Sequence, residues 1–401
     1  MPRVRQGETA VDQFDVSPPG TGQLSPVRFA ALCLTHNCNL RCRYCYAGPK
    51  SNRAMDPTTL RTSIDFLLVN SGTKCTITFL GGEPLLQFEL LMEAVRYAGE
   101  VAPGQLAFRM STNGTLLDSE KLTLLAENNV TFVLSVDGHP SQHDRNRFYE
   151  SGTGSYVATL SHVREILTWN PYTIAVSVVA PNTGPDLAEG VQHLFGQSFR
   201  YVLQTLDFSA TWTRRDLTIL ERQYRAVAAF YAQQLRRNNK IYYSPFDERI
   251  RTWAVRPYKN GDLCDMANSQ IAIAPSGRIY PCVQFVGSDG QGEIKNAIGD
   301  VFSGFVPDAR KKCVALNYEE KESCRDCALL GRCMSYCGCV NFRGTGHINQ
   351  VPPIVCEHER LLMPIVDDLA EQLWNDGVSL FERKFYEKTY PISSFVEDCM
   401  V

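Results

Sequence analysis

The spacing of the cysteines constrains this chain more than any other feature. Three of its fifteen cysteines fall close together as Cys38, Cys42 and Cys45, and most of the others lie between residues 261 and 357. In a long chain whose amino terminus shows no export signal, clustered cysteines indicate metal ligands sooner than disulfides. We therefore expect a fold built around metal sites.

The first group has the spacing Cys-x3-Cys-x2-Cys. Three thiolates on one tight loop can hold three corners of a four-iron cluster, which leaves the fourth iron without a protein ligand. The alternative is a zinc site or a set of buried thiols, but zinc sites favour paired Cys-x2-Cys elements that give four ligands. The loop therefore predicts an iron–sulfur cluster with one open iron.

From Val27 to about Leu206, short β-branched runs alternate with amphipathic stretches. This alternation is typical of βα units around a parallel sheet. The predicted strands are RFAALCLT, CTITFL, LAFRMS, TFVLSV, TIAVSVV and FRYVLQTL. The pattern predicts an α/β fold, a partial (β/α)6 TIM-like barrel.

Short polar motifs follow three of these strands, and ligands collect at the carboxyl ends of parallel strands. We therefore expect the motifs to share one mouth with the cysteine loop. Glycines there would let the backbone approach a ligand, and Glu83 could accept hydrogen bonds from an ammonium group, although ordinary turns are the alternative. The motifs are Gly81-Gly82-Glu83-Pro84, Ser111-Thr112-Asn113-Gly114 and Ser135-Val136-Asp137-Gly138.

The cysteine loop, with Tyr44 before its third cysteine, resembles the signature of the radical S-adenosylmethionine (SAM) superfamily. The resemblance implies that the methionine end of SAM chelates the open iron and that one electron cleaves SAM to a 5'-deoxyadenosyl radical. Cys38, Cys42 and Cys45 would carry this chemistry, with Arg147 placed against the carboxylate of SAM. The residues implied in SAM binding are Tyr44, Gly81, Gly82, Glu83, Pro84, Ser111, Asn113, Ser135 and Arg147.

The later cysteines resemble the SPASM domain, which holds two auxiliary iron–sulfur clusters in enzymes that mature peptides and proteins. Their pattern is Cys264-x12-Gly277-x4-Cys282, then Cys324-x2-Cys327-x5-Cys333-x3-Cys337, then Cys356. The resemblance implies one cluster on Cys324, Cys327, Cys333 and Cys356, and three ligands of the other on Cys264, Cys282 and Cys337. The fourth ligand is Cys313 or Cys339, or that iron stays open to substrate. Two structural zinc sites are the alternative for this segment taken alone.

This architecture implies one of two substrate classes. Sulfatases receive a formylglycine, whereas ribosomally made precursor peptides receive thioether or carbon–carbon crosslinks. In sulfatase-maturating enzymes an Asp follows the cysteine of the Gly-x4-Cys element, but here Val283 follows Cys282. A peptide maturase supplied by a flavodoxin or ferredoxin-type electron donor is therefore the favoured function. A zinc-binding module without catalysis is the alternative of another class, and neither Asp265 nor Tyr280 stands out as a catalytic base.

The charge balance limits the remaining partners. With 40 basic and 43 acidic residues the net charge is -3, which gives no overall field to attract nucleic acid or an anionic membrane. No apolar run approaches the roughly 20 residues that a spanning helix needs. We expect a cytoplasmic protein that binds neither nucleic acid nor membrane.

The chain is expected to divide into five parts. Long helices are predicted over 214–237 and 358–374, and the segment after residue 261 should need its metals to fold because it has many glycines and few apolar runs. Cys33 and Cys75 are expected in the core, and Cys399 has no evident role. The parts are an N-terminal extension (1–27), the radical SAM partial barrel (28–210), a bridging helical region (211–260), the SPASM auxiliary-cluster domain (261–357), and a C-terminal helix and tail (358–401).

Overall fold

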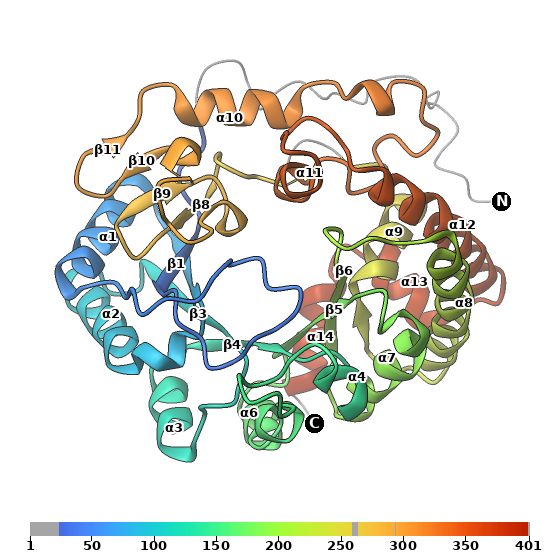
Figure 1. The fold of residues 1–401 in the computed structure, drawn as a ribbon. Helices are drawn as coiled ribbons and strands as arrows, with labels where there is room; N and C mark the ends of the chain where they lie inside the picture. The colour runs from blue at the N-terminus through green and yellow to red at the C-terminus, as the bar shows by residue number, and fades with distance from the viewer. Residues whose placement is uncertain (1–23, 259–263, 293, 400–401) are drawn as a thin grey trace.

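A computed structural model describes residues 24–258, 264–292 and 294–399. Its parallel strands curve around the interior of the molecule, and helices cover the outside (Figure 1). All six predicted strands are present, which confirms the α/β partial barrel. They are β1 (Phe29–Thr35), β2 (Cys75–Gly81), β3 (Leu106–Thr112), β4 (Thr131–Ser135), β5 (Ile174–Val179) and β6 (Tyr201–Leu206).

A further parallel strand, β7 (Tyr242–Tyr243), pairs with β6 and was not predicted, because two residues are too short to show an alternating pattern. The helix α1 is capped by Asp56, whose side chain accepts a 3.0 Å hydrogen bond from the backbone N–H of Thr59. The helices of this half are α1 (Pro57–Asn70), α2 (Phe88–Val101), α3 (Ser119–Glu127), α4 (Pro140–Asp144), α5 (Tyr156–Thr159), α6 (Val163–Trp169), α7 (Leu187–Gly196), α8 (Arg214–Arg236) and α9 (Ser244–Ala254), with 3-10 turns η1 (Pro84–Gln87) and η2 (Gly184–Asp186).

The cysteine-rich segment continues the same sheet. Its first strand, β8 (Gln270–Ile273), pairs in parallel with β1, and β9 (Arg278–Tyr280), β10 (Gly299–Asp300) and β11 (Gly304–Phe305) follow in antiparallel order. Among the described residues the strands therefore form one eleven-stranded sheet with β1 between β8 and β2. The other elements of this segment are η4 (Val283–Phe285), η5 (Ile294–Asn296), α10 (Ala309–Tyr318), η6 (Glu322–Cys324) and α11 (Gly338–Thr345).

The carboxyl-terminal part is helical. The helix α12 (Pro353–Asn375) begins earlier than the predicted start at His358, because Pro353 takes the first helical position, where the missing N–H of proline costs little. Cys356 consequently lies inside the helix. The tail, expected to be mixed, forms α13 (Ser379–Tyr386) and α14 (Tyr390–Cys399).

Two hydrophobic clusters fill the interior. One joins β1, β2 and β3 to the cysteine-rich segment through fully buried residues such as Ile271 and Ile279. The other joins β4, β5 and β6 to α8, α12 and α13, with Tyr224 and Leu362 among its buried members. Each half of the barrel is thus backed by a segment from the later part of the chain.

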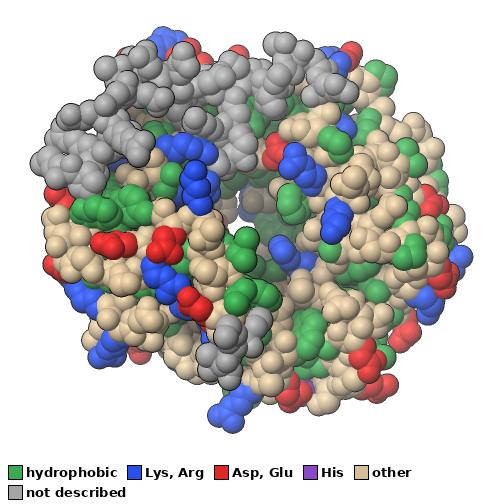
Figure 2. Space-filling view, turned by 180° about the vertical axis from the view of Figure 1, so that it is seen from behind, with side chains coloured by type: hydrophobic (Ala, Val, Ile, Leu, Met, Phe, Trp, Pro, Cys, Tyr) green, Lys and Arg blue, Asp and Glu red, His purple; other side chains and the backbone are tan. Residues whose placement is uncertain are grey.

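Figure 2 shows a hollow near the middle of the face opposite that of Figure 1, with charged side chains of both signs scattered around it. Among the described residues, none of the helices combines the length and the apolar character needed to cross a membrane. Almost all of the predicted N-terminal extension, and the side chain of Cys399, lie outside the described residues.

Candidate active site

The cysteine loop lies between β1 and α1, at the carboxyl end of β1. Cys38 is buried, Cys42 and Cys45 are partly exposed, and all three line one cavity of about 250 Å³. The loop is held by its own hydrogen bonds, from the Leu40 N–H to the Cys38 sulfur (3.4 Å) and from the Cys45 N–H to the Cys42 carbonyl (3.2 Å). The three thiols therefore face a common space, as a shared cluster requires.

Two charged side chains act on these thiols. Lys50 donates a 2.9 Å hydrogen bond to the sulfur of Cys45. Burial raises the pKa of Cys42 to about 11, whereas the nearby Arg147 guanidinium lowers it. Lys50 was not predicted, since a lysine five positions after a cysteine carries no distinctive sequence signal.

The Gly-Gly-Glu-Pro motif follows β2 and packs against the cysteine loop. The Gly82 N–H donates to the Thr35 carbonyl (2.7 Å), and the Glu83 N–H donates to the Asn37 carbonyl (2.9 Å). A β-carbon on Gly82 would lie 1.8 Å from the Asn37 oxygen. Gly81 and Gly82 line the cavity as predicted, but they also permit a close approach to the protein's own backbone. Pro84 is buried at the start of η1 and is not among the residues that line the cavity.

Glu83 is a buried carboxyl group that joins β2 to β3. It accepts hydrogen bonds from the Thr112 hydroxyl (2.7 Å) and from the backbone N–H groups of Asn113 (2.9 Å) and Leu85 (3.1 Å). Burial raises the pKa of Glu83 to about 7, and these hydrogen bonds oppose the rise. A carboxylate has about four acceptor sites, so Glu83 keeps capacity for one more donor.

The other predicted side chains come from the ends of β3 and β4. Ser111, Asn113 and Ser135 all line the cavity. The amide nitrogen of Asn113 lies 3.0 Å from the Asn39 side-chain oxygen and 3.8 Å from the Cys38 sulfur, so it touches the cysteine loop directly. The strand ends and the loop thus form one connected wall, as the motif order predicted.

Arg147 and Tyr44 both contact Asp137, a residue of the motif after β4 for which no role in SAM binding was predicted. The Arg147 guanidinium lies 3.0 Å from the carboxylate of Asp137 and 5.3 Å from the centre of the Tyr44 ring. The Tyr44 hydroxyl also donates to Asp137, which accepts a further 2.9 Å bond from the Val178 N–H. Arg147 was expected against the SAM carboxylate, and in this structure it lines the cavity while paired with Asp137. The position of Asp137 after β4 was the available signal for its role.

His143 lies near this group, and both of its ring nitrogens have partners within the protein. Its Nδ1 accepts from the Asp137 N–H (3.3 Å), its Nε2 lies 3.0 Å from the Ser155 hydroxyl, and burial lowers its pKa to about 3. The ring is therefore neutral and holds the loop after β4.

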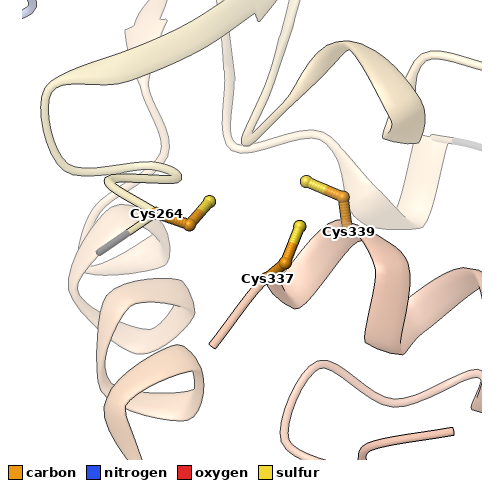
Figure 3. Close-up of side chains that lie close together, drawn as sticks. All are labelled: Cys264, Cys337 and Cys339. Carbon is orange, nitrogen blue, oxygen red and sulfur yellow. The ribbon is translucent and has the colours of Figure 1, made fainter. Parts of the chain in front are cut away.

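A second group of thiols gathers in the cysteine-rich segment. The sulfur atoms of Cys264, Cys337 and Cys339 lie within 4.8 Å of one another, and Figure 3 shows their side chains pointing toward a common point. Cys282 is buried beside them. The structure thus brings two of the three predicted ligands, Cys264 and Cys337, together with Cys339, and the third, Cys282, lies buried nearby.

The third group is more loosely arranged. Cys324 and Cys333 are buried, and Cys327 and Cys356 are partly exposed. Burial raises the pKa of Cys356, and the nearby Cys324 and Cys327 raise it further, which identifies them as its neighbours. Within the described residues, only the Cys264 group brings three possible ligand atoms within 4.8 Å.

The other cysteines and the two possible catalytic bases contact residues of the core or of their own turns. Cys33 and Cys75 are buried in the core, as expected. The Tyr280 hydroxyl donates to Asp289 (2.9 Å), and Asp265 accepts from Asn268 (2.8 Å) in its own turn. Neither Asp265 nor Tyr280 lines the cavity at the first cysteine loop.

Comparisons with known proteins agree with this geometry. Residues 32–169 match the family model of the radical SAM superfamily, and these residues include the cysteine loop and the strand-end motifs. An uncharacterised protein of Methanocaldococcus jannaschii is 34% identical over 165 residues, which are 41% of this chain and 57% of that protein. The chain is thus matched over less than two thirds of the length of this relative.

Two relatives have named activities. A cysteine-type anaerobic sulfatase-maturating enzyme of Clostridium perfringens is 22% identical over 336 residues, which are 78% of this chain and 89% of that enzyme. The antilisterial bacteriocin subtilosin biosynthesis protein AlbA of Bacillus subtilis is 24% identical over 280 residues, which are 67% of this chain and 58% of that protein.

Among solved structures, anSMEcpe with bound AdoMet superposes with a TM-score of 0.73 at 18% identity, and the match covers 89% of this chain and 98% of that one. At this identity the likeness establishes the fold alone. The family model that matches residues 32–169 and the gathering of its motif residues at one cavity both point to the radical SAM superfamily. Residues 32–169 of the chain therefore carry a domain that matches the radical SAM superfamily.

Proposed function

We propose that this chain is a peptide maturase that abstracts hydrogen from a ribosomally made precursor peptide and installs a thioether or carbon–carbon crosslink, or a related modification. The observation that carries the proposal is the set of three loop thiols facing one cavity with the strand-end motifs. Cys38, Cys42 and Cys45 would hold a 4Fe-4S cluster with one iron free for SAM. Together, the cluster and SAM supply the reductive cleavage that gives a 5'-deoxyadenosyl radical.

The surrounding residues would bind and orient SAM. Glu83 has an acceptor site left for the ammonium group, and Asn113 stands between the cysteine loop and the end of β3. Arg147 offers a buried cation to the carboxylate of SAM, although it would then share that contact with Asp137. The site would be lined by Tyr44, Gly81, Gly82, Ser111 and Ser135. Pro84 would hold the Gly-Gly-Glu-Pro loop in place without lining the site.

The later cysteines would hold two auxiliary clusters in a SPASM domain over residues 261–357. Cys324, Cys327, Cys333 and Cys356 would ligate one, and Cys264, Cys282 and Cys337 would supply three ligands of the other. A cavity of about 290 Å³ supports a substrate role for the space between them, because it is lined by Cys264, Cys333 and Cys337 and by the end of β6. That edge of the barrel is shared with the first site, so a peptide could reach both.

The peptide class is favoured over the sulfatase class by one residue. Val283 stands where a sulfatase-maturating enzyme carries an Asp, and an alkyl side chain cannot accept a proton. The electron donor would be a flavodoxin or ferredoxin-type protein, because the clusters in this scheme need an external source of electrons.

The proposal is tested with protein reconstituted without oxygen. Given SAM and a reductant, it should produce 5'-deoxyadenosine, and the variant with Cys38, Cys42 and Cys45 all changed to Ala should produce none. Cys75→Ala, a buried cysteine on β2 away from the cavity, is the matched control and should retain the activity. Cleavage retained in the triple variant would end the proposal. Incubation with precursor peptides encoded beside this gene should then give a mass loss that matches a crosslink.

Sulfatase maturation is the second candidate, and the long match to the Clostridium perfringens enzyme favours it. Peptides bearing a Cys or Ser target would show a formylglycine mass shift if this candidate is right. We expect no shift, because Val283 replaces the acidic residue. The match of residues 32–169 to an enzyme superfamily argues against the third candidate, a zinc-binding module without catalysis, and zinc without inorganic sulfide in the purified protein is the result that would revive it.

A further inference from the structure

The spacing of the cysteines leaves one auxiliary site with three ligands, and the structure points to the fourth. We propose that Cys339 completes the site formed by Cys264, Cys282 and Cys337, so that this centre has no iron open to a substrate. The inference rests on the proposed function, because it concerns one of the auxiliary clusters named there.

The first observation is the position of the Cys339 sulfur. It lies within 4.8 Å of the sulfur atoms of both Cys264 and Cys337, and the three side chains converge in Figure 3. Cys282, the remaining predicted ligand, is buried close by. Cys339 therefore lies near all three predicted ligands.

The second observation is the packing that sets this position. Cys337 caps the amino end of α11 and Cys339 lies in its first turn, with Gly338 between them. A β-carbon on Gly338 would lie 2.5 Å from the Asn317 side-chain oxygen and 2.7 Å from the terminal carbon of Met266. Only glycine lets α11 approach this closely, and the approach brings both thiols to the site.

The same asparagine, Asn317, also contacts the segment that carries Cys264. The Asn317 side-chain nitrogen donates to the Cys264 carbonyl (3.2 Å), so α10 fixes Cys264 and α11 relative to each other. Cys339 is only 2% exposed, and its thiol contacts the Met266 sulfur at 3.8 Å. Cys282 is buried as well, whereas Cys264 and Cys337 are partly exposed, and the four thiols together offer donor atoms that suit a metal.

Cys313 is the competing candidate, and its surroundings differ. It lies on α10 in the hydrophobic core, where burial raises its pKa to about 12 and the nearby Cys282 raises it further. It is absent from the group of converging sulfur atoms. Its setting is that of a small hydrophobic side chain.

The test uses the full chain with Cys38, Cys42 and Cys45 changed to Ala, so that only the auxiliary sites remain. In this background we compare Cys339→Ala with Cys313→Ala after reconstitution without oxygen, by iron, inorganic sulfide and Mössbauer spectrum. Cys339→Ala should lose between one iron and a whole cluster, up to about half of the iron of the background protein. Cys313→Ala should match the background in all three measurements.

A milder variant guards against simple misfolding. Cys339→Ser keeps the volume and offers an oxygen ligand, so it should retain most of the iron but show a changed spectrum. Parent-like iron and spectra in both Cys339 variants, or cluster loss in Cys313→Ala alone, would overturn the assignment. A background protein that holds zinc and no sulfide would instead overturn the proposed function, and the zinc content of the same variants would then test Cys339 as a ligand.

Discussion

The two best-defined cysteine groups are built in opposite ways. Cys38, Cys42 and Cys45 come from one short loop and face a cavity that strand-end residues share. Cys264, Cys337 and Cys339 come from segments more than seventy residues apart and face one another. The first arrangement leaves the thiols facing residues that could hold a cofactor beside the metal, whereas the second turns the thiols toward one another.

The difference also concerns what holds each group in place. The loop is tied to a barrel whose strands are already paired, through contacts such as Asn113 with Asn39. The second group depends on α10 and α11, which flank a stretch with few regular elements. We therefore expect the first site to persist without metal and the second to depend on it.

Metal removal should produce the largest effect. Chelation of iron without oxygen should abolish most hydrogen-exchange protection over residues 319–352, where only η6 and α11 provide regular structure. Protection in β1, β2 and β3 of the same sample should change little, which makes the barrel the internal control. If residues 319–352 and the strands β1 to β3 remained equally protected after chelation, the predicted difference between the two cysteine groups would be wrong.

Asp137→Ala should cost about 3–5 kcal/mol of unfolding free energy, because it leaves the buried Arg147 cation without its partner. Tyr44→Phe removes only one hydrogen bond to the same carboxylate and should cost about 1–2 kcal/mol. Denaturant unfolding measures both variants. A smaller loss for Asp137→Ala than for Tyr44→Phe would show that the pair does not support the first site.

Glu83 should make stability depend on pH. Its pKa rises from an ordinary 4.5 to about 7 in the folded protein, so between these values the folded state holds a proton that the unfolded state has released. Stability should therefore fall as pH rises from about 4.5 to 7, by about 3 kcal/mol in total. Glu83→Gln cannot ionise and should show a flatter profile in SAM-free protein unfolded at a series of pH values. An unchanged slope in the variant would contradict the assignment.

Gly82→Ala should cost about 1–3 kcal/mol of unfolding free energy, since the new β-carbon meets the Asn37 carbonyl at 1.8 Å and the loop must shift. SAM binding, measured by equilibrium dialysis, should weaken with it. Gly99→Ala on α2 meets nothing within 4 Å and should be neutral or slightly stabilising. Normal SAM binding in Gly82→Ala would show that the close contact between the two loops is dispensable.

Local patterns explain why much of the barrel was predictable. The strands β1 to β6 and the start of α1 follow from β-branched runs and from Asp56 before Pro57, signals that lie within a few residues. The cavity-lining residues followed from strand order, because parallel strands end at one edge. Their roles in SAM binding stay predictions.

Features set by distant packing were not predictable in the same way. The contact of Arg147 with Asp137 and the pairing of the short β7 with β6 depend on neighbours that the local sequence does not reveal. The choice between Cys313 and Cys339 is of the same kind, since both lie at reasonable spacings. Only the approach of α11 to Asn317 and Met266 separates them.

The position of β1 in the sheet has a practical consequence. It carries the cysteine loop at its end and is hydrogen-bonded on one side to β2 and on the other to β8, which follows it by more than two hundred residues. A shortened protein that stops before β8 would leave β1 as a bare, largely apolar edge, open to pairing with another molecule. Expression of the barrel by itself should therefore give aggregated material rather than a smaller enzyme.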